Sequence, residues 1–204
     1  MKILWITNIL LPDAEEHLEI GKSVIGGWMD SLLQGVKEEN VKVGVLSLAN
    51  VTELKIFNKN NVDYFVLPKN THVTKDWNTV EEVFNADIIH IHGTEFSYGM
   101  NYLKLFPDKN YVVSIQGLVP VYARYYFAGI PLFKILKNTT LRDFIYGSLF
   151  KKQKDFVKRG KLEIEYIKKC KNVIGRTSWD KTHTYFFNKK AKYFFCNESL
   201  RSNF

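Results

Sequence analysis

The sequence has few cysteines, no long apolar run and no low-complexity segment. Its two cysteines, Cys170 and Cys196, are too few for a disulfide framework or a zinc site. We therefore expect a reducing, cytoplasmic compartment, with Cys196 in a buried strand. No segment approaches the roughly 20 apolar residues of a membrane-spanning helix. Thr7 and Asn8 interrupt the short apolar run at the start, so we expect no secretory signal peptide.

Familiar catalytic and phosphate-binding patterns are also missing. The chain has neither the three spaced glycines of a dinucleotide-binding loop nor the lysine of a phosphate-binding P-loop. Nothing in it resembles a Ser/His/Asp triad or a pair of hydrolase carboxylates. What remains is a chain of 204 residues, 46% of them hydrophobic, which is enough for one ordinary domain with a buried core.

Positive charge is concentrated in one segment, residues 119–161. This segment holds ten Lys or Arg and two Asp, which accounts for the net charge of +8 of the whole chain. It is also rich in aromatic and aliphatic residues. Basic and aromatic residues together favour an anionic membrane surface as a partner, and nucleic acid less so. The alternative is a long helix with a solvated lysine face.

Strand-like apolar runs alternate with helical patterns along the chain. This alternation predicts an α/β fold, a single Rossmann-like three-layer domain with a mostly parallel sheet of about seven strands and right-handed crossovers. We expect the strand order 3-2-1-4-5-6, a seventh strand at the edge, and helices on both faces. The expected strands cover residues 2–7, 41–48, 62–67, 87–91, 111–115, 171–175 and 191–196.

One connection, residues 116–170, is far longer than the others. Its pattern predicts a short helix near 120–128 and a long helix from Leu141, where Thr140 begins a capping-box motif. Gly160 is expected to kink or end the long helix. The segment 119–161 is therefore expected to be a basic, aromatic, helical insert within the domain.

Polar residues and glycines follow the predicted strands, where open parallel sheets bind ligands. Gly26 and Gly27 precede a helix whose N-terminus could hold a phosphate, although a plain glycine turn is the alternative. His92 ends the fourth strand and could reach a ligand, unless it is structural. We expect His90 to pack away from it, on the opposite side of the strand. No companion ligand accompanies His92 at metal-binding spacing, so we expect no metal site.

Two further strand ends carry polar side chains. Gln116 can donate and accept hydrogen bonds but cannot transfer a proton. Arg176 offers a planar cation that suits phosphate or carboxylate, with an ion pair inside the protein as the alternative. Thr177 and Asp180 have the spacing of a capping box. The residues expected to converge on one concave face are Gly26, Gly27, His92, Gln116 and Arg176.

Taken together, the chain resembles the amino-terminal, acceptor-side domain of a bacterial family 4 glycosyltransferase with the GT-B architecture. In that family two Rossmann-like domains face a cleft, and the carboxyl-terminal one, which we expect to be absent here, holds the nucleotide sugar. The resemblance covers nearly all of residues 1–204. It rests on MKILWITN, the Gly-Gly loop before a helix, ADIIHIHG, VVSIQGLV followed by YARYYFAGIP, and GRTSWDK with KYFFCNESLR.

The resemblance also implies roles for individual residues. Gly26 and Gly27 would lie against the donor diphosphate, and His92 would lie near the transferred sugar. Gln116 stands where the family often has a histidine, which leaves it a hydrogen-bonding role and puts an acid–base role in doubt. His92 and Gln116 are thus the expected catalytic positions.

The implied reaction moves a sugar from a nucleotide sugar to a hydroxyl of a lipid-linked or oligosaccharide acceptor. Asn8, Arg124 and Arg176 are the expected contacts to acceptor or phosphate. The resemblance implies retention of configuration, a role in surface polysaccharide synthesis, and no cofactor or metal ion. We expect a cytoplasmic protein, with peripheral attachment to the inner face of the plasma membrane through the basic insert.

Two other functions remain open at this stage. One is a sugar-nucleotide epimerase of similar architecture, which would need acid and base residues from a second domain. The other is a non-enzymatic module that binds membrane or nucleic acid through residues 119–161.

Overall fold

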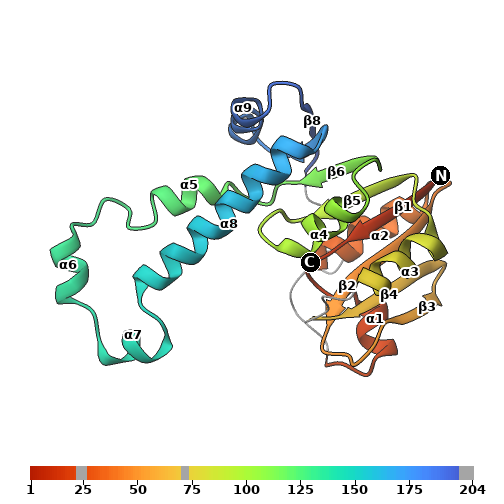
Figure 1. Cartoon of the computed structure of the whole chain (residues 1–204), viewed down its shortest axis with the longest axis horizontal. Helices are drawn as coiled ribbons and strands as arrows, with labels where there is room; N and C mark the ends of the chain where they lie inside the picture. Colours follow the sequence, from red (N-terminus) through yellow and green to blue (C-terminus); the bar gives the residue numbers. More distant parts are fainter. Residues whose placement is uncertain (22–26, 70–73, 198–204) are drawn as a thin grey trace.

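The computed structural model describes residues 1–21, 27–69 and 74–197. It has an α/β body, from which a helical arm projects to the left in Figure 1. The sheet of the body has the strand order β3-β4-β2-β1-β5-β6-β7-β8, and every neighbouring pair is parallel except β3 with β4. The strands are β1 Lys2–Ile6, β2 Lys42–Ala49, β3 Lys55–Lys59, β4 Val62–Pro68, β5 Ile88–His92, β6 Tyr111–Ser114, β7 Asn172–Gly175 and β8 Lys192–Phe195.

The predicted fold class is confirmed, and the expected strands occur in the expected order. The sequence prediction missed β3, which forms an antiparallel hairpin with β4 at one edge of the sheet. Asn60 and Asn61 form its two-residue turn, with φ values of 53° and 65°. Asparagine tolerates this left-handed conformation, which two-residue hairpin turns require. The prediction for Cys196 was wrong, because β8 ends at Phe195 and Cys196 is exposed.

Two apolar cores lie on opposite faces of the sheet. The larger one joins the strands to α3, α4 and α8, through residues such as Val80, Met100 and Ile167. The smaller one joins β1, β2 and β4 to α1 and α2, through residues such as Met29 and Val45. The helices are α1 Pro12–His17, α2 Gly27–Lys37, α3 Thr74–Phe84, α4 Ser97–Leu105, α5 Val119–Arg124, α6 Leu132–Lys137, α7 Leu141–Tyr146, α8 Leu149–Lys169 and α9 Ser178–Phe187.

The expectation that helices cover both faces is wrong for β5, β6 and β7. Their burial alternates: Val113 is buried whereas Val112 and Ser114 on the other face are half-buried. These strands follow one another in one direction across the sheet, so right-handed crossovers place their connecting helices on a single face. The opposite face of β5–β7 is therefore only partly covered. This half-open face is bordered on one side by α2.

The arm consists of residues 119–169, from the start of α5 to the end of α8 (Figure 1). The expected single helix from Leu141 is wrong, because Gly147 adopts φ 97° and separates α7 from α8. The Thr140–Asp143 capping box at the start of α7 is confirmed. None of the helices in the described ranges is long and apolar enough to cross a bilayer.

Gly160 does not end α8, which runs through it to Lys169. Instead it allows α5 to approach α8 closely. A Cβ built on Gly160 would lie 2.8 Å from Cα of Pro120 and 3.0 Å from its nitrogen. Such distances to backbone atoms can be relieved only if the two helices move apart.

Replacing Gly160 with alanine should therefore lower the free energy of unfolding by about 1–3 kcal/mol, because the added methyl overpacks the contact between the helices. The matched control is Gly35→Ala within α2, where the added Cβ would have no described atom within 4 Å apart from the neighbouring backbone of its own helix. Because alanine has the higher helix propensity, Gly35→Ala should raise stability by up to about 1 kcal/mol. Urea unfolding of both variants measures the difference, and a stabilising Gly160→Ala would contradict this packing.

Candidate functional site

A cleft of about 310 Å³ lies on the half-open face of the sheet. Its floor is mostly apolar, its wall is α2, and its polar end lies at the carboxyl ends of β5, β6 and β7. Parallel α/β sheets bind ligands at this edge. Residues of the floor, the wall and the polar end include Ile88, Val112 and Ile174, then Trp28, Leu32 and Val36, then His92, Gln116 and Arg176.

His92 lies at the centre of the polar end. Its side chain is only 1% exposed, yet neither ring nitrogen has a hydrogen-bond partner among the described residues. Aromatic rings surround it: the ring centroids of Trp5, His90 and Trp28 lie 4.7, 3.8 and 6.1 Å from its own. Burial in these apolar surroundings, together with the charge of a protonated His90, holds the pKa of His92 well below its ordinary value. The imidazole is therefore neutral near pH 7.

The prediction that His90 and His92 point to opposite sides was wrong. Side chains two apart on a strand share a face, so both rings enter the cleft. Nε2 of His90 is 2.7 Å from Oγ of Ser114 on the neighbouring strand. Burial lowers the pKa of His90 to about 4, so this ring is also neutral near pH 7. The pair supplies hydrogen-bonding groups without a positive charge.

Arg176 and Gln116 lie side by side at the end of β6 and β7. Nη2 of Arg176 donates a hydrogen bond to the backbone oxygen of Gln116 at 2.5 Å. The backbone nitrogen of Arg176 donates to Oδ2 of Asp180 at 2.9 Å. The same carboxylate accepts from Thr177 in the capping box that begins α9, which confirms that prediction. The cap thus fixes the backbone from which Arg176 enters the cleft.

The other predicted site residues differ in their placement. Gly27 begins α2, directly before the cleft residue Trp28, whereas Gly26 lies outside the described residues. Asn8 follows β1 and is half-buried, but the described lining of the cleft does not include it. Arg124 lines a second cavity of about 450 Å³ between α5 and α9, together with Trp179. The structure therefore gathers His92, Gln116 and Arg176 in one cleft, which Gly27 adjoins only in sequence, through Trp28, and sets Asn8 and Arg124 apart.

Among the residues that line the cleft, sequence reasoning missed Trp5, Trp28, His90 and Ser114. The period of two along a strand could have found His90 and Ser114, since each shares a face with a residue that was predicted. Trp5 lies on β1, next to His90 in the parallel register, and could have been found in the same way. Trp28 depends on how α2 docks on the sheet, which no local pattern indicates.

The chemistry available in this cleft is hydrogen bonding, aromatic contact and one guanidinium. Two neutral imidazoles, an amide and a hydroxyl suit a ligand with many hydroxyl groups, and Arg176 suits an anionic group. Within the described ranges, no group of three or more His, Cys, Asp or Glu side chains could hold a metal ion.

No protein-family model matches this sequence, and no curated protein matches it either. Solved structures do resemble it. Sucrose-phosphate synthase from Thermosynechococcus elongatus has a TM-score of 0.56 at 10% identity, over 95% of this chain and 47% of that one. Two likenesses are weaker. Glycyrrhiza uralensis UGT73P12 has a TM-score of 0.46 at 8% identity, and the match covers 96% of this chain and 48% of that one. A UDP-forming trehalose-phosphate synthase from Burkholderia vietnamiensis has a TM-score of 0.43 at 10% identity, and the match covers 93% of this chain and 42% of that one.

The fold is one half of a GT-B architecture. The chain spans about half the length of the sucrose-phosphate synthase that it resembles. At 10% identity this likeness concerns the fold alone. Assignment to family 4 and to the amino-terminal half remain predictions from the sequence motifs.

Proposed function

We propose that this chain is the acceptor-side half of a glycosyltransferase. The longer enzyme transfers a sugar from a nucleotide sugar to a hydroxyl of a lipid-linked or oligosaccharide acceptor, with retention of configuration. It acts at the cytoplasmic face of a membrane, in the synthesis of surface polysaccharide. The observation that carries the proposal is His92: a buried, neutral imidazole that has no hydrogen-bond partner among the described residues, at the strand ends of a GT-B half. A buried polar group without a partner costs free energy, so a ligand that pairs with it is favoured.

In this proposal each group of the cleft has a distinct part. His92 hydrogen-bonds a hydroxyl of the transferred sugar or of the acceptor. Arg176 and the N-terminus of α2, with Gly26 and Gly27 before and at its start, offer positive potential to the leaving diphosphate. Gln116 orients the sugar by hydrogen bonds, since an amide cannot exchange a proton with it.

The direct test is a transfer assay on the longer enzyme, with a panel of nucleotide sugars and of lipid-linked and free oligosaccharide acceptors. We expect release of nucleoside diphosphate that depends on both substrates. Interconversion of nucleotide sugars without any acceptor would instead indicate an epimerase. Binding of substrates without turnover would contradict the proposed enzyme.

The 204-residue chain by itself should bind nucleotide sugars weakly or not at all. Gly26 and Gly27, with the N-terminus of α2, are proposed to make only a phosphate contact, and the proposal assigns the base and ribose contacts to the other half. Isothermal titration calorimetry with uridine and guanosine diphosphate sugars measures this. A submicromolar dissociation constant would mean that the donor site lies in this half.

A further inference from the structure

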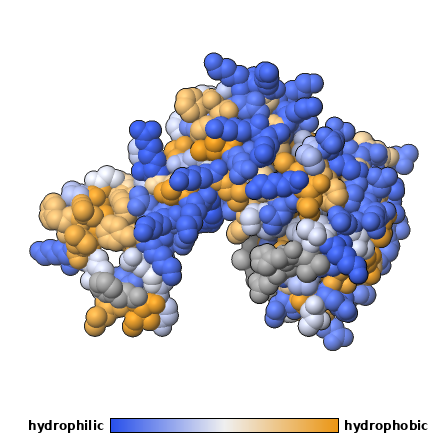
Figure 2. All heavy atoms as spheres, viewed as in Figure 1, coloured by the Kyte–Doolittle hydropathy of each residue, from blue (hydrophilic) through white to orange (hydrophobic). Residues whose placement is uncertain are grey.

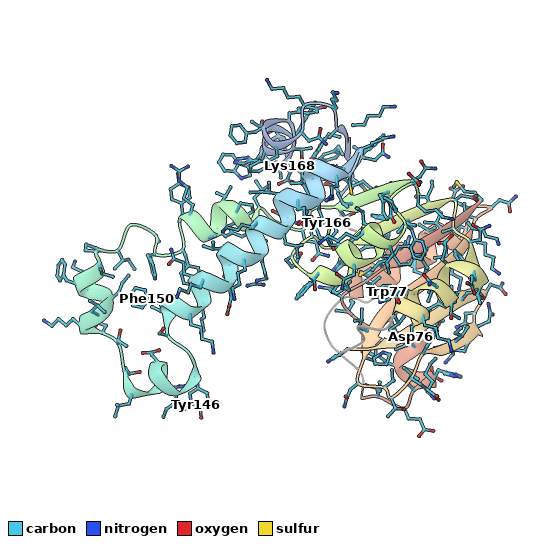
Figure 3. All side chains as sticks on the ribbon, in the orientation of Figure 1. Asp76, Trp77, Tyr146, Phe150, Tyr166 and Lys168 are labelled. Carbon is cyan, nitrogen blue, oxygen red and sulfur yellow. The ribbon has the colours of Figure 1, made fainter. Side chains whose placement is uncertain are left out.

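The tip of the arm exposes a group of apolar side chains far from the body. We define the arm tip as residues 130–149, which include α6 and α7. Leu141, Ile145 and Tyr146 are 83%, 75% and 78% exposed. Figure 2 shows hydrophobic residues at this end of the molecule, and Figure 3 places Tyr146 there. Other exposed apolar residues of the tip are Ile130, Leu132, Phe133, Leu136 and Leu149.

Cations accompany these apolar residues. The tip contains Lys134, Lys137 and Arg142, and α8 continues with five more Lys or Arg before Gly160. The acid of the tip is Asp143, whose carboxylate accepts hydrogen bonds from the nitrogen and Oγ1 of Thr140 in the cap of α7. Within the part of the chain that the structure describes, no Lys or Arg of residues 119–161 lies within 4.0 Å of a carboxylate oxygen in an ion pair.

Helix α8 separates this tip from the body. Glu163, Tyr166 and Ile167 of α8 are buried where the helix meets the sheet, and Figure 3 shows Tyr166 at this junction. The hydroxyl of Tyr166 donates to the backbone oxygen of Phe96 at 2.8 Å. The start of α8 at Leu149 lies fourteen residues before Glu163, which is about 21 Å of helix. The tip is therefore presented away from the cleft on a helix fastened at its other end.

We propose that the arm tip docks on an anionic lipid surface. Its short helices would place their apolar side chains at the boundary of the headgroups, while the cations of α6, α7 and α8 contact lipid phosphates. This inference is independent of the proposed glycosyl transfer, because it rests on the arm alone.

The observations favour lipid over the two other classes of partner. Sites for single-stranded nucleic acid stack bases on aromatic rings. Most of the exposed apolar side chains of the tip are aliphatic. A symmetric contact with a second copy of the chain would bring the cations of one tip against those of the other. An anionic bilayer satisfies the apolar and the basic groups together.

Sedimentation of the 204-residue chain with vesicles tests the proposal, using phosphatidylglycerol mixed with phosphatidylcholine against phosphatidylcholine alone. We expect binding to the anionic vesicles that weakens as salt is raised. One surface cation contributes about fivefold to such binding, so the charge variant Lys134→Gln, Lys137→Gln, Arg142→Gln should lose about 100-fold. The apolar variant Leu141→Ser, Ile145→Ser, Tyr146→Ser should lose at least about 10-fold, because it removes the inserted side chains. These residues are exposed, so both variants should fold, as circular dichroism can verify.

The matched control, Lys189→Gln, Lys190→Gln, Lys192→Gln, removes the same charge from the body and should change binding by less than about threefold. An equal loss in this control would mean a diffuse electrostatic attraction and would overturn the proposal. So would equal binding to both lipids, no binding, displacement from anionic vesicles by short RNA, or dimerisation in sedimentation velocity that the apolar variant abolishes.

A fluorophore distinguishes insertion from attachment by charge alone. Ile145→Cys in a Cys196→Ser background offers one exposed thiol for an environment-sensitive dye, since Cys170 is buried. With anionic vesicles the emission should shift to the blue and be quenched by brominated lipid chains. An unchanged spectrum on bound vesicles would mean that the tip does not insert.

Discussion

Replacing Glu163 with alanine is expected to lower the free energy of unfolding by about 2–4 kcal/mol, a large effect for an α8 residue. Glu163 fastens the arm to the body. Oε1 accepts from the backbone nitrogen of Val119 at 3.0 Å, and Oε2 accepts from Oγ1 of Thr94 at 2.6 Å. All three groups are buried, so truncation leaves Val119 and Thr94 without a partner and opens a cavity. Urea unfolding at pH 5 measures this loss.

Glu163 should also make stability depend on pH. Burial raises its pKa to about 7, against hydrogen bonds from Thr94 and Val119 that lower it. Because the folded carboxyl binds its proton more tightly than the unfolded one, the free energy of unfolding should fall as pH rises from about 4.5 through about 7. The fall attributable to this group is at most about 3 kcal/mol.

Glu163→Gln separates this effect from other titrations. The amide resembles the protonated acid, because it can accept from Val119 and donate to the oxygen of Thr94. The variant should therefore match the wild type at pH 5 and exceed it in stability at pH 8. The opposite result would be a wild type that becomes more stable than Glu163→Gln as pH rises from 5 to 8. It would show that the ionised form of Glu163, and not the protonated form, stabilises the fold.

Replacing His92 with alanine should lower kcat/KM of the longer enzyme by about 100-fold, the effect typical of losing one aligned hydrogen bond in the transition state. The comparison is Ser114→Ala, which removes the hydrogen-bond partner of His90 on the same face of the cleft. This variant should lower kcat/KM by less than about 10-fold. Steady-state transfer rates measure both. Since the pKa of His92 lies well below its ordinary value, no loss from its protonation should appear between pH 6 and pH 8.

The His92→Ala result must be separated from damage to packing, because the ring fills space between Trp5 and Trp28. His92→Asn keeps a hydrogen-bonding group at this position and should recover part of the activity. Equal activity of His92→Ala and wild type would remove His92 from the proposed mechanism. Equal losses in the alanine and asparagine variants, together with lowered thermal stability, would assign it a structural role.

The parallel strands could be predicted because each is a run of apolar residues that a buried sheet requires. Their order followed from handedness and short crossovers. The same handedness implied that one face of β5–β7 would lack helices, but the apolar runs were interpreted as covered on both sides. Half-buried Val112 and Ile174 are instead the floor of the cleft.

Other features depend on contacts between distant residues and leave no local pattern. Glu163 is an acid among lysines in a helix, as a solvated face would have. Its burial follows from contacts with Thr94 and Val119, which are 69 and 44 residues away. Gly160 suggested a kink in the long helix, whereas a glycine is needed there because the backbone of Pro120 leaves no room for a Cβ. The composition of the arm indicated a partner surface, but only the fold shows that its apolar residues gather at a projecting tip.

A crystal structure of the longer enzyme with its nucleotide sugar tests the central claim most directly. The account predicts the sugar and diphosphate at the polar end of the cleft, with a ring nitrogen of His92 about 3 Å from a sugar oxygen and Arg176 facing the acceptor or the phosphates. A ligand bound elsewhere, with His92 still lacking a partner, would contradict it.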